Sequence, residues 1–351
     1  MSPALARTLL ACALATIAAA AAADPHYTAV LVDVHQGGIQ ALGANGVAVG
    51  YTLPLRSDRV ARSLAIKGGR SFTFAPLGYE RSFAHAISSA GDIAGEITPP
   101  PHSTASSYLR RADGTTSLVE VMDAGIVARP VQVYGVNASG TVVGWYTDRH
   151  DHFIAYSWRD GVSTSHPSSL GGAQSWIFGI DDRGLMVGSA EVAANVEHAV
   201  TWAPDGTLTE LPALPGGNGV GGALGVSANG TIVGSTTASD GWSHAVTWRA
   251  GTVTDLGTLP RATWSSAYAI DSAGNVVGQS GVGPLHDGSY VVSAVLWRNG
   301  RPIDLAAITT LPPDTTMTAA IGIADDGTLL VSGATHGNTA GATLILTPDA
   351  N

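Results

Sequence analysis

The chain has 351 residues, a formal net charge of −10, and 45% apolar against only 13% charged residues. So high an apolar fraction excludes a disordered chain, and the acidic composition, with Lys67 as the one lysine, excludes nucleic acid and anionic lipid as expected partners. The single cysteine, Cys12, excludes a disulfide within the chain and a zinc site built from cysteines.

Residues 1–23 have the pattern of a secretory signal peptide. Arg7 precedes an apolar stretch over residues 8–20, and Ala21–Ala23 supplies the small residues of a cleavage site. The stretch is too short to span a membrane as a helix, so we expect no membrane insertion. Lipoprotein cleavage at Cys12 is disfavoured because Arg7 lies too close to it. The sequence therefore predicts a secreted protein, either extracellular or periplasmic.

Residues 24–351 are predicted to form a single domain of about seven repeats. Each copy holds a strand, a tight turn and a second strand ending in glycine, as in residues 135–144 and 269–278; the copy at 322–331 is looser. The turn glycines fall at positions 46, 91, 140, 184, 230, 274 and 327. In five copies a short polar residue stands three positions before this glycine, as a type I turn requires: Ser88, Asn137, Asp181, Ser227 and Asp271.

Each repeat also contains a second hairpin, whose first strand carries a tryptophan at one position in four copies: Trp158, Trp202, Trp248 and Trp297. Repetition at one register predicts packing within the repeat rather than ligand contact. Two hairpins in about 45 residues match one propeller blade, so the sequence predicts an all-β, seven-bladed β-propeller of four-stranded antiparallel blades. The last repeat lacks a fourth strand, and Tyr27–Val34 is predicted to supply it and close the ring.

One stretch carries a family resemblance. It contains His244-Ala245-Val246-Thr247-Trp248, then Asp-Leu-Gly-Thr-Leu at 255–259, then Ile-Asp-Ser-Ala-Gly-Asn-Val-Val-Gly at 270–278. It resembles the HAF-repeat extracellular proteins, and the likeness extends over nearly all of residues 24–351. The chain departs from the family pattern because valine replaces phenylalanine at 200 and 246, and the histidine occurs only at His198 and His244. The resemblance implies a secreted protein of undetermined activity and supplies no catalytic residues.

In a four-stranded meander the connections between second and third strands share one face with the connections between blades. Variable loops on a rigid scaffold are where binding usually occurs, so this face is predicted to hold a ligand site over 98–106, 145–152, 235–243 and 279–289. The aromatic residues predicted to contact a sugar ring or a peptide there are Trp145, Tyr146, Trp176, Trp242 and Trp264. The competing interpretation, which burial statistics favour, is that these rings cover the joints between blades.

The densest polar cluster is Asp148–His152. Imidazole and carboxylate together suit several divalent metals, so His150 and His152 are also candidate ligand contacts. Because the cluster is one contiguous loop without a partner elsewhere in the sequence, a solvated turn is favoured and no metal site is predicted. His198 and His244 precede the tryptophan strand in register, and each is predicted to form a hydrogen bond within its blade.

The sequence contains no G-x-S-x-G elbow, no phosphate-binding loop and no H-E-x-x-H motif. The adjacent carboxylates Asp181-Asp182 and Asp325-Asp326 lie in predicted tight turns. Two functions stay open. The first is a non-catalytic binding or scaffold protein for a carbohydrate or protein ligand; the second is a polysaccharide hydrolase or lyase using carboxylates from different blades. We expect a monomer without a cofactor.

Overall fold

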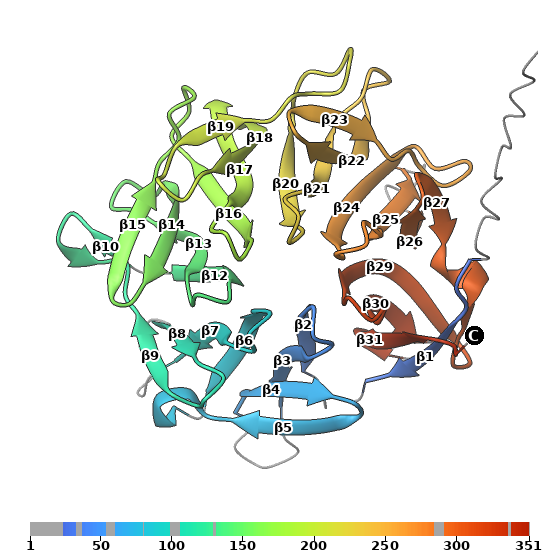
Figure 1. Cartoon of the computed structure of the whole chain (residues 1–351), viewed down its shortest axis with the longest axis horizontal. Coiled ribbons are helices and arrows are strands. Elements are labelled where there is room, and N and C mark those ends of the chain that lie inside the picture. Colours follow the sequence, from blue (N-terminus) through green and yellow to red (C-terminus); the bar gives the residue numbers. More distant parts are fainter. Residues whose placement is uncertain are drawn as a thin grey trace, which may run out of the picture.

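The computed structural model describes residues 24–32, 37–53, 60–79, 81–98, 106–128, 131–283, 291–335 and 338–350. These residues form seven blades of four antiparallel strands around a central axis, which confirms the predicted fold class (Figure 1). In each blade the first strand is nearest the axis and has no strand partner on its inner edge.

Blade 1 consists of β2 (Gly38–Leu42), β3 (Ala48–Thr52), β4 (Arg62–Lys67) and β5 (Arg70–Phe74). Blade 2 consists of β6 (Ser82–Ile87), β7 (Ile93–Ile97), β8 (Ser106–Arg110) and β9 (Thr116–Val119). Blade 3 consists of β12 (Val131–Val136), β13 (Val142–Thr147), β14 (Phe153–Arg159) and β15 (Val162–His166). Blade 4 consists of β16 (Ser175–Ile180), β17 (Met186–Ala193), β18 (Val196–Trp202) and β19 (Leu208–Glu210).

Blade 5 consists of β20 (Gly221–Val226), β21 (Ile232–Thr237), β22 (Ser243–Arg249) and β23 (Thr252–Asp255). Blade 6 consists of β24 (Trp264–Ile270), β25 (Val276–Val282), β26 (Val291–Arg298) and β27 (Arg301–Asp304). Blade 7 consists of β29 (Thr315–Ile323), β30 (Leu329–Thr335), β31 (Asn338–Pro348) and β1 (Tyr27–Leu31). The connections hold the 3-10 helices η1 (Pro76–Gly78) and η2 (Leu305–Ile308), and the short strands β10 (Met122–Asp123), β11 (Ile126–Val127) and β28 (Thr309–Thr310).

The N-terminal strand β1 closes the ring, as the sequence predicts. It pairs antiparallel with β31, so that Tyr27 lies opposite Pro348 and Leu31 opposite Leu344. The amide of Val32 extends the ladder by donating to the carbonyl of Thr343 at 2.9 Å. Residues 33 and 34, the end of the predicted strand, lie outside the described residues.

The turns between first and second strands, which define the turn face, have the predicted chemistry. Each capping side chain accepts the amide N–H four residues further on, at 2.8–3.2 Å: Ser88, Asn137, Asp181, Ser227 and Asp271. The glycines that follow have positive φ, as in Gly91 and Gly140. One carboxylate of each Asp-Asp pair links blades: Asp182 accepts from the amide of Ala138 at 2.8 Å, and Asp325 accepts from the amide of Ser272 at 3.0 Å. These carboxylates are structural, as predicted.

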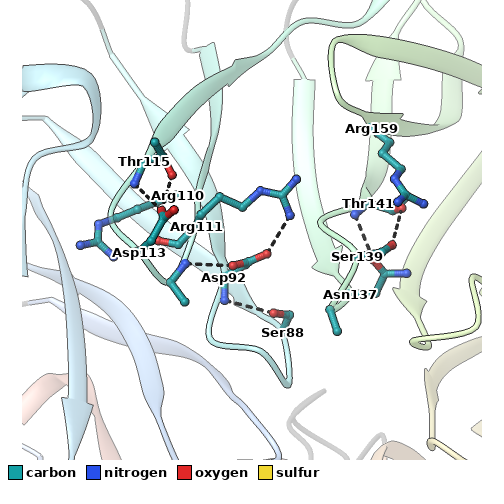
Figure 2. A network of polar contacts seen from close by, with 12 residues as sticks. Ser88, Asp92, Arg110, Arg111, Asp113, Thr115, Asn137, Ser139, Thr141 and Arg159 are labelled. Carbon is teal, nitrogen blue, oxygen red and sulfur yellow. Dashed lines mark hydrogen bonds and ion pairs between the residues drawn. The ribbon is translucent and has the colours of Figure 1, made fainter.

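On the turn face, Arg111 links blade 2 to blade 3, and Figure 2 shows its ion pair with Asp92. Arg111 pairs with Asp92 of its own blade at 3.0 Å and with Asp160 of blade 3 at 3.2 Å. Its guanidinium covers Gly140, where an added Cβ would lie 1.8 Å from Nη1. Glycine is therefore required at position 140 for two reasons: it allows positive φ, and it leaves room for the arginine side chain.

The tryptophans that repeat in sequence are buried, which confirms their predicted packing role. Trp202, Trp248 and Trp297 are each 1% exposed. A second repeated contact joins neighbouring blades: a buried serine at the beginning of an innermost strand accepts an amide N–H from the third strand of the preceding blade. Ser175 accepts from Ala155, and Ser265 accepts from Ala245. In the part of the chain that the structure describes, no helix is long and apolar enough to cross a membrane.

Candidate ligand-binding site

Every innermost strand contains a β-bulge at a corresponding position. In blade 3 the register shifts between Val133 and Gly135, which leaves Tyr134 as the extra residue, and each of the other blades repeats this shift; blade 7 has a second bulge. The bulge explains the glycine that ends each repeat. At Gly144 an added Cβ would lie 1.9 Å from the carbonyl oxygen of Gln132, so no larger residue fits there.

The same clearance of 1.9–2.0 Å recurs at the glycine of the second strand in all seven blades: Gly50, Gly95, Gly144, Gly188, Gly234, Gly278 and Gly333. In blade 7 this glycine, Gly333, lies two residues beyond Val331, where the sequence copy ends, and it pairs with Met317 beside the second bulge. The looser seventh repeat is therefore a blade of the same design, with two extra residues in β30 and three in β29 between the turn and this glycine pair.

Each bulge leaves one extra residue on the innermost strand of its blade. We call this set the bulge ring: Gln40, His85, Tyr134, Phe178, Leu224, Tyr268 and Ile321. Gln40 is exposed, Tyr134 is 44% exposed, and the others are half-buried, whereas the preceding residue of each strand is buried. Tyr134 meets Phe178 of the next blade edge-to-face, with ring centroids 5.5 Å apart. The ring is mixed, with amide, imidazole and phenol groups beside apolar side chains.

Three aromatic rings gather nearer the face formed by the connections between blades, which we call the long-loop face. Trp145 lies edge-on to Phe153 at 4.7 Å between ring centroids, and Phe153 lies 6.0 Å from Trp176 of the next blade. All three side chains are half-buried. We call them the mouth cluster, and it contains two of the predicted site residues.

A buried carboxylate positions the mouth cluster. Glu191, 4% exposed, accepts the amides of Ala173 and Gln174 at 3.1 Å and the side-chain amide of Gln174 at 3.2 Å. Burial by itself raises the pKa of Glu191, but these donors and the amide of Asn195 bring it below its ordinary value. Gln174 in turn accepts the amide N–H of Phe153 at 3.3 Å. Glu191 therefore fixes the loop that holds Phe153 beside Trp176.

A smaller aromatic group lies between blades 1 and 2. Tyr51 meets Phe83 edge-to-face at 4.9 Å, and the Arg81 guanidinium carbon lies 5.9 Å from the Phe83 ring centroid. His85 stacks near the same ring, and its Nε2 atom lies 3.8 Å from a carboxylate oxygen of Glu96. This histidine is the one titratable imidazole of the bulge ring.

Two of the other predicted aromatic residues are packed into the blades. Tyr146 is 3% exposed in the core between blades 2 and 3, where its hydroxyl lies 3.0 Å from that of Ser165. Trp264 is half-buried at the beginning of β24, against Gly281. Like Trp145, Tyr146 belongs to strand β13 and not to a loop, because β13 pairs with β12 as far as Tyr146 and with β14 as far as Thr147. The predicted loop 145–152 is therefore shortened to 148–152.

The remaining predicted contacts lie apart from the mouth cluster. Trp242 is 37% exposed in the turn after β21, and its amide donates to Asp240 at 2.9 Å. Residues 99–105 and 284–289 of the other predicted loops lie outside the described residues. The second-to-third connection of blade 4 is only a tight turn at Asn195, whereas the sequence predicts that these connections are long and varied.

The loop with His150 and His152 is an Asp-capped turn. Both histidine amides donate to Asp148 at 2.8 Å. Burial alone raises the pKa of Asp148, but these two amides and the nearby imidazoles bring it below its ordinary value. Among the described residues no group of three or more His, Cys, Asp or Glu could hold a metal ion. The geometry is that of a solvated turn, in which His152 Nδ1 lies 3.4 Å from a carboxylate oxygen of Asp148.

His198 and His244, which recur before the tryptophan strand, form the predicted hydrogen bonds within their blades. His198 Nδ1 lies 2.5 Å from Glu210, and His244 Nδ1 lies 2.8 Å from Asp255. Each pair joins the third and fourth strands of one blade. These contacts confirm a structural role for His198 and His244.

Sequence reasoning missed the bulge ring, although a signal exists. A bulky residue stands directly before the glycine or alanine that begins each repeat copy, as in Tyr134-Gly135, Phe178-Gly179 and Tyr268-Ala269. The small residue lets neighbouring innermost strands approach, since an added Cβ at Gly135 would lie 3.4 Å from Ile180 of the next blade. Counting the repeat from the glycine places the bulged residue outside it.

No family model and no curated protein matches this sequence. Among solved structures the chain is similar to a streptogramin B lyase, with 11% identity and a TM-score of 0.50 over 92% of this chain and 98% of the lyase. It is also similar to a catalytically inactive virginiamycin B lyase from Staphylococcus aureus with quinupristin, with 10% identity and a TM-score of 0.54 over 93% and 100% of the two chains. At these identities the likeness shows a shared propeller fold and leaves the activity open.

Proposed function

We propose that this chain is a secreted carbohydrate-binding β-propeller whose ligand contacts the mouth cluster. The observation that carries the proposal is the half-buried Trp145–Phe153–Trp176 group at the joint between blades 3 and 4, near the long-loop face. A pyranose presents C–H groups on its faces and hydroxyls around its edge, so it is recognised by aromatic faces beside neutral donors and acceptors. Gln132, opposite Trp145 in the sheet, supplies such a neutral amide.

The alternative of a polysaccharide hydrolase or lyase is less well supported. A glycosidase needs two carboxyl groups on opposite sides of the scissile bond. The seven innermost strands, all described, contain no Asp, Glu, Lys or Arg, and Glu96 of β7 lies beside His85 rather than beside a second carboxylate. Binding is therefore the function that the geometry supports best.

Two further parts of the proposal rest on the sequence. The signal-peptide pattern of residues 1–23 supports secretion, and the repeated Asp-Leu and Val-Val-Gly motifs support membership of the HAF-repeat extracellular proteins. A secreted propeller without disulfides depends on packing alone, which the buried tryptophan of successive blades supplies.

A glycan array probed with the mature protein tests this function. We expect retention on a subset of glycans, and Trp145→Ala or Trp176→Ala to weaken binding by about tenfold or more, because each removes a stacking face. Trp242→Ala is the matched control, since it removes a partly exposed tryptophan outside the cluster. Near-ultraviolet circular dichroism of the buried tryptophans would verify the fold of each variant. Absence of retention, or equal loss in all three variants, would contradict the proposal.

A further inference from the structure

We infer that the outer end of the joint between blades 1 and 2 binds an acidic polysaccharide, one whose sugar units carry carboxylate groups. This site is separate from the mouth cluster, which lies between blades 3 and 4, and does not depend on it. Strands β4, β5 and β8 bring three cations and two aromatic rings together there. We call this set the rim patch: Lys67, Arg70, Phe72, Phe74 and Arg110.

Regular strand pairing places four of these side chains on one side of blade 1. Strands β4 and β5 pair without a register shift, with Lys67 opposite Arg70 and Ala65 opposite Phe72. Residues that lie opposite each other, and alternate residues along one strand, share a side of the sheet. Lys67, Arg70, Phe72 and Phe74 therefore lie on the same side.

This side of blade 1 faces blade 2. Ser63, which pairs with Phe74, has its hydroxyl 3.0 Å from that of Tyr108 on β8. At the end of β8, the guanidinium carbon of Arg110 lies 5.1 Å from the centroid of the Phe74 ring. The ring of Phe72 is 6.2 Å from that of Phe74. The two rings thus form a short row with an arginine at one end.

Phe72 departs from the repeat at an exposed position. Counted from the glycine of the second strand, the corresponding residue of the next four blades is a small hydroxylated one: Ser117, Thr164, Thr209 and Thr254. Phe72 is 52% exposed, so its ring contributes little to the packing of its own blade. An aromatic ring in this place is available for contact with a ligand.

The rim patch is cationic although the whole chain is acidic. The described residues of blade 1 contain no Asp or Glu, and the ion pairs between described residues include neither Lys67 nor Arg70. Asp113 lies near Arg110, but its carboxylate accepts the amide N–H of Thr115 at 2.8 Å (Figure 2). The net charge of −10 therefore does not describe this part of the surface.

Blade 6 shows how the same arrangement is neutralised elsewhere. There Arg298 lies opposite Arg301, as Lys67 lies opposite Arg70 in blade 1. In blade 6 a carboxylate of Asp24 lies 2.7 Å from Arg301. Like charges directly opposite each other destabilise a sheet, so an anion bound between Lys67 and Arg70 would relieve their repulsion.

The order of groups along β5 fits a chain that presents both charge and sugar surface. From Arg70 to Phe74 the strand extends over about 13 Å, with the cation pair at one end, Arg110 at the other and Phe72 between them. Guanidinium and ammonium groups pair with carboxylates, and aromatic rings pack against the C–H faces of pyranoses. A polyuronate supplies both in every unit. An acidic peptide supplies the carboxylates without the pyranose face.

Binding of the mature protein to polygalacturonate, measured by biolayer interferometry, tests the site. Methyl-esterified polygalacturonate removes the charge from the same sugar backbone, and poly-L-glutamate keeps the charge without the sugar. We expect polygalacturonate to bind at least about tenfold more tightly than either comparison, because it alone engages the cations and the rings together. The binding should weaken as the salt concentration rises, since the cations are exposed.

Two variants of the rim patch separate the contacts. Phe72→Thr installs the residue that blades 3 to 5 carry, and Lys67→Gln combined with Arg70→Gln removes the cation pair; each should weaken binding by about tenfold. All three side chains are exposed, so the variants should fold. Arg249→Gln is the matched control and should retain full affinity, because Arg249 occupies the position of Lys67 in blade 5 with Thr252 opposite it.

Trp145→Ala, in the mouth cluster, should leave binding to polygalacturonate unchanged, so that failure of the proposed function and failure of the rim patch appear separately. Equal binding to poly-L-glutamate would overturn the sugar contact, and equal binding to the methyl ester would overturn the charge contact. Full affinity in either rim variant, or no binding by the wild type, would overturn the site.

Discussion

His166 occupies a position where the neighbouring blades have leucine. His166 pairs with Ala155 of the third strand. The residues that pair with the corresponding alanine in the next three blades are Leu211, Leu256 and Leu305. The imidazole is buried, with Nε2 2.9 Å from the hydroxyl of Ser157. Burial lowers the pKa of His166 to about 4, so the fold holds it in the neutral form.

This burial makes the fold sensitive to acid before the carboxylates titrate. Because the folded pKa lies below the unfolded value of 6.5, the unfolded chain takes up a proton first as the pH falls. The contribution of neutral His166 to the free energy of unfolding is fully present above pH 6.5. It is lost progressively as the pH falls towards 4, by about 3 kcal/mol. His166→Leu should flatten this part of the curve of unfolding free energy against pH, as measured by urea denaturation.

Ser157→Ala is the control for His166, because it removes the hydrogen-bond partner and keeps the titrating imidazole. This variant should be less stable at every pH and still lose stability between pH 6.5 and 4. An unchanged pH dependence in His166→Leu would show that other groups cause the acid sensitivity.

At the scale of one element, the bulged hairpin explains why the repeat ends in Val-Val-Gly. The glycine is required by space and not by its backbone angles, since at Gly278 an added Cβ would lie 2.0 Å from the carbonyl oxygen of Ser266. The turn glycine of the same hairpin, Gly274, has the opposite character: its φ is +88° and its surroundings are open.

The two glycines of blade 6 therefore allow a direct comparison. Gly278→Ala should cost about 3 kcal/mol of unfolding free energy, because the backbone of β24 must move and the bulge with it. Gly274→Ala should cost about 1 kcal/mol, the strain of positive φ alone. Denaturant titration of both variants gives the ranking, and equal costs would show that the bulge tolerates a side chain.

At the scale of the whole molecule, stability depends on closing the ring with a strand from the other end of the chain. Tyr27 of β1 is 3% exposed and packs with Leu344 of blade 7 and Val277 and Leu296 of blade 6. Just beyond the end of β31, Asp349 accepts from the hydroxyl of Thr28 at 2.7 Å. The closing strand thus joins two blades as well as completing one.

Tyr27→Ala should weaken this closure by about 3–5 kcal/mol, the usual cost of removing a large buried aromatic side chain. Val30→Ala, on the same strand with 58% of the residue exposed, should change stability by less than about 0.5 kcal/mol. Thermal unfolding combined with size-exclusion chromatography measures both, since a loosened β1 exposes the edge of β31 and favours association. Similar melting temperatures for the two variants would show that closure contributes little.

The sequence by itself determined the repeat, the strand content, the turn chemistry and the strand exchange at the ends. Each of these is a local pattern: a polar cap and a glycine define a turn such as Asn137–Gly140, and a repeated tryptophan marks a buried register. The resemblance of Val32 and Asp33 to later strands was also local, and it was enough to predict that β1 completes blade 7.

Only the tertiary structure decided on which side of a blade each aromatic side chain lies. Tyr146 and Trp145 are neighbours in sequence, yet one lies in the core and the other in the mouth cluster, because alternate residues of a paired strand face opposite sides. Trp176 and Phe153 meet only when blades 3 and 4 pack together. The bulge ring depends on register shifts that no single strand reveals, since a bulge exists only in relation to its partner strand.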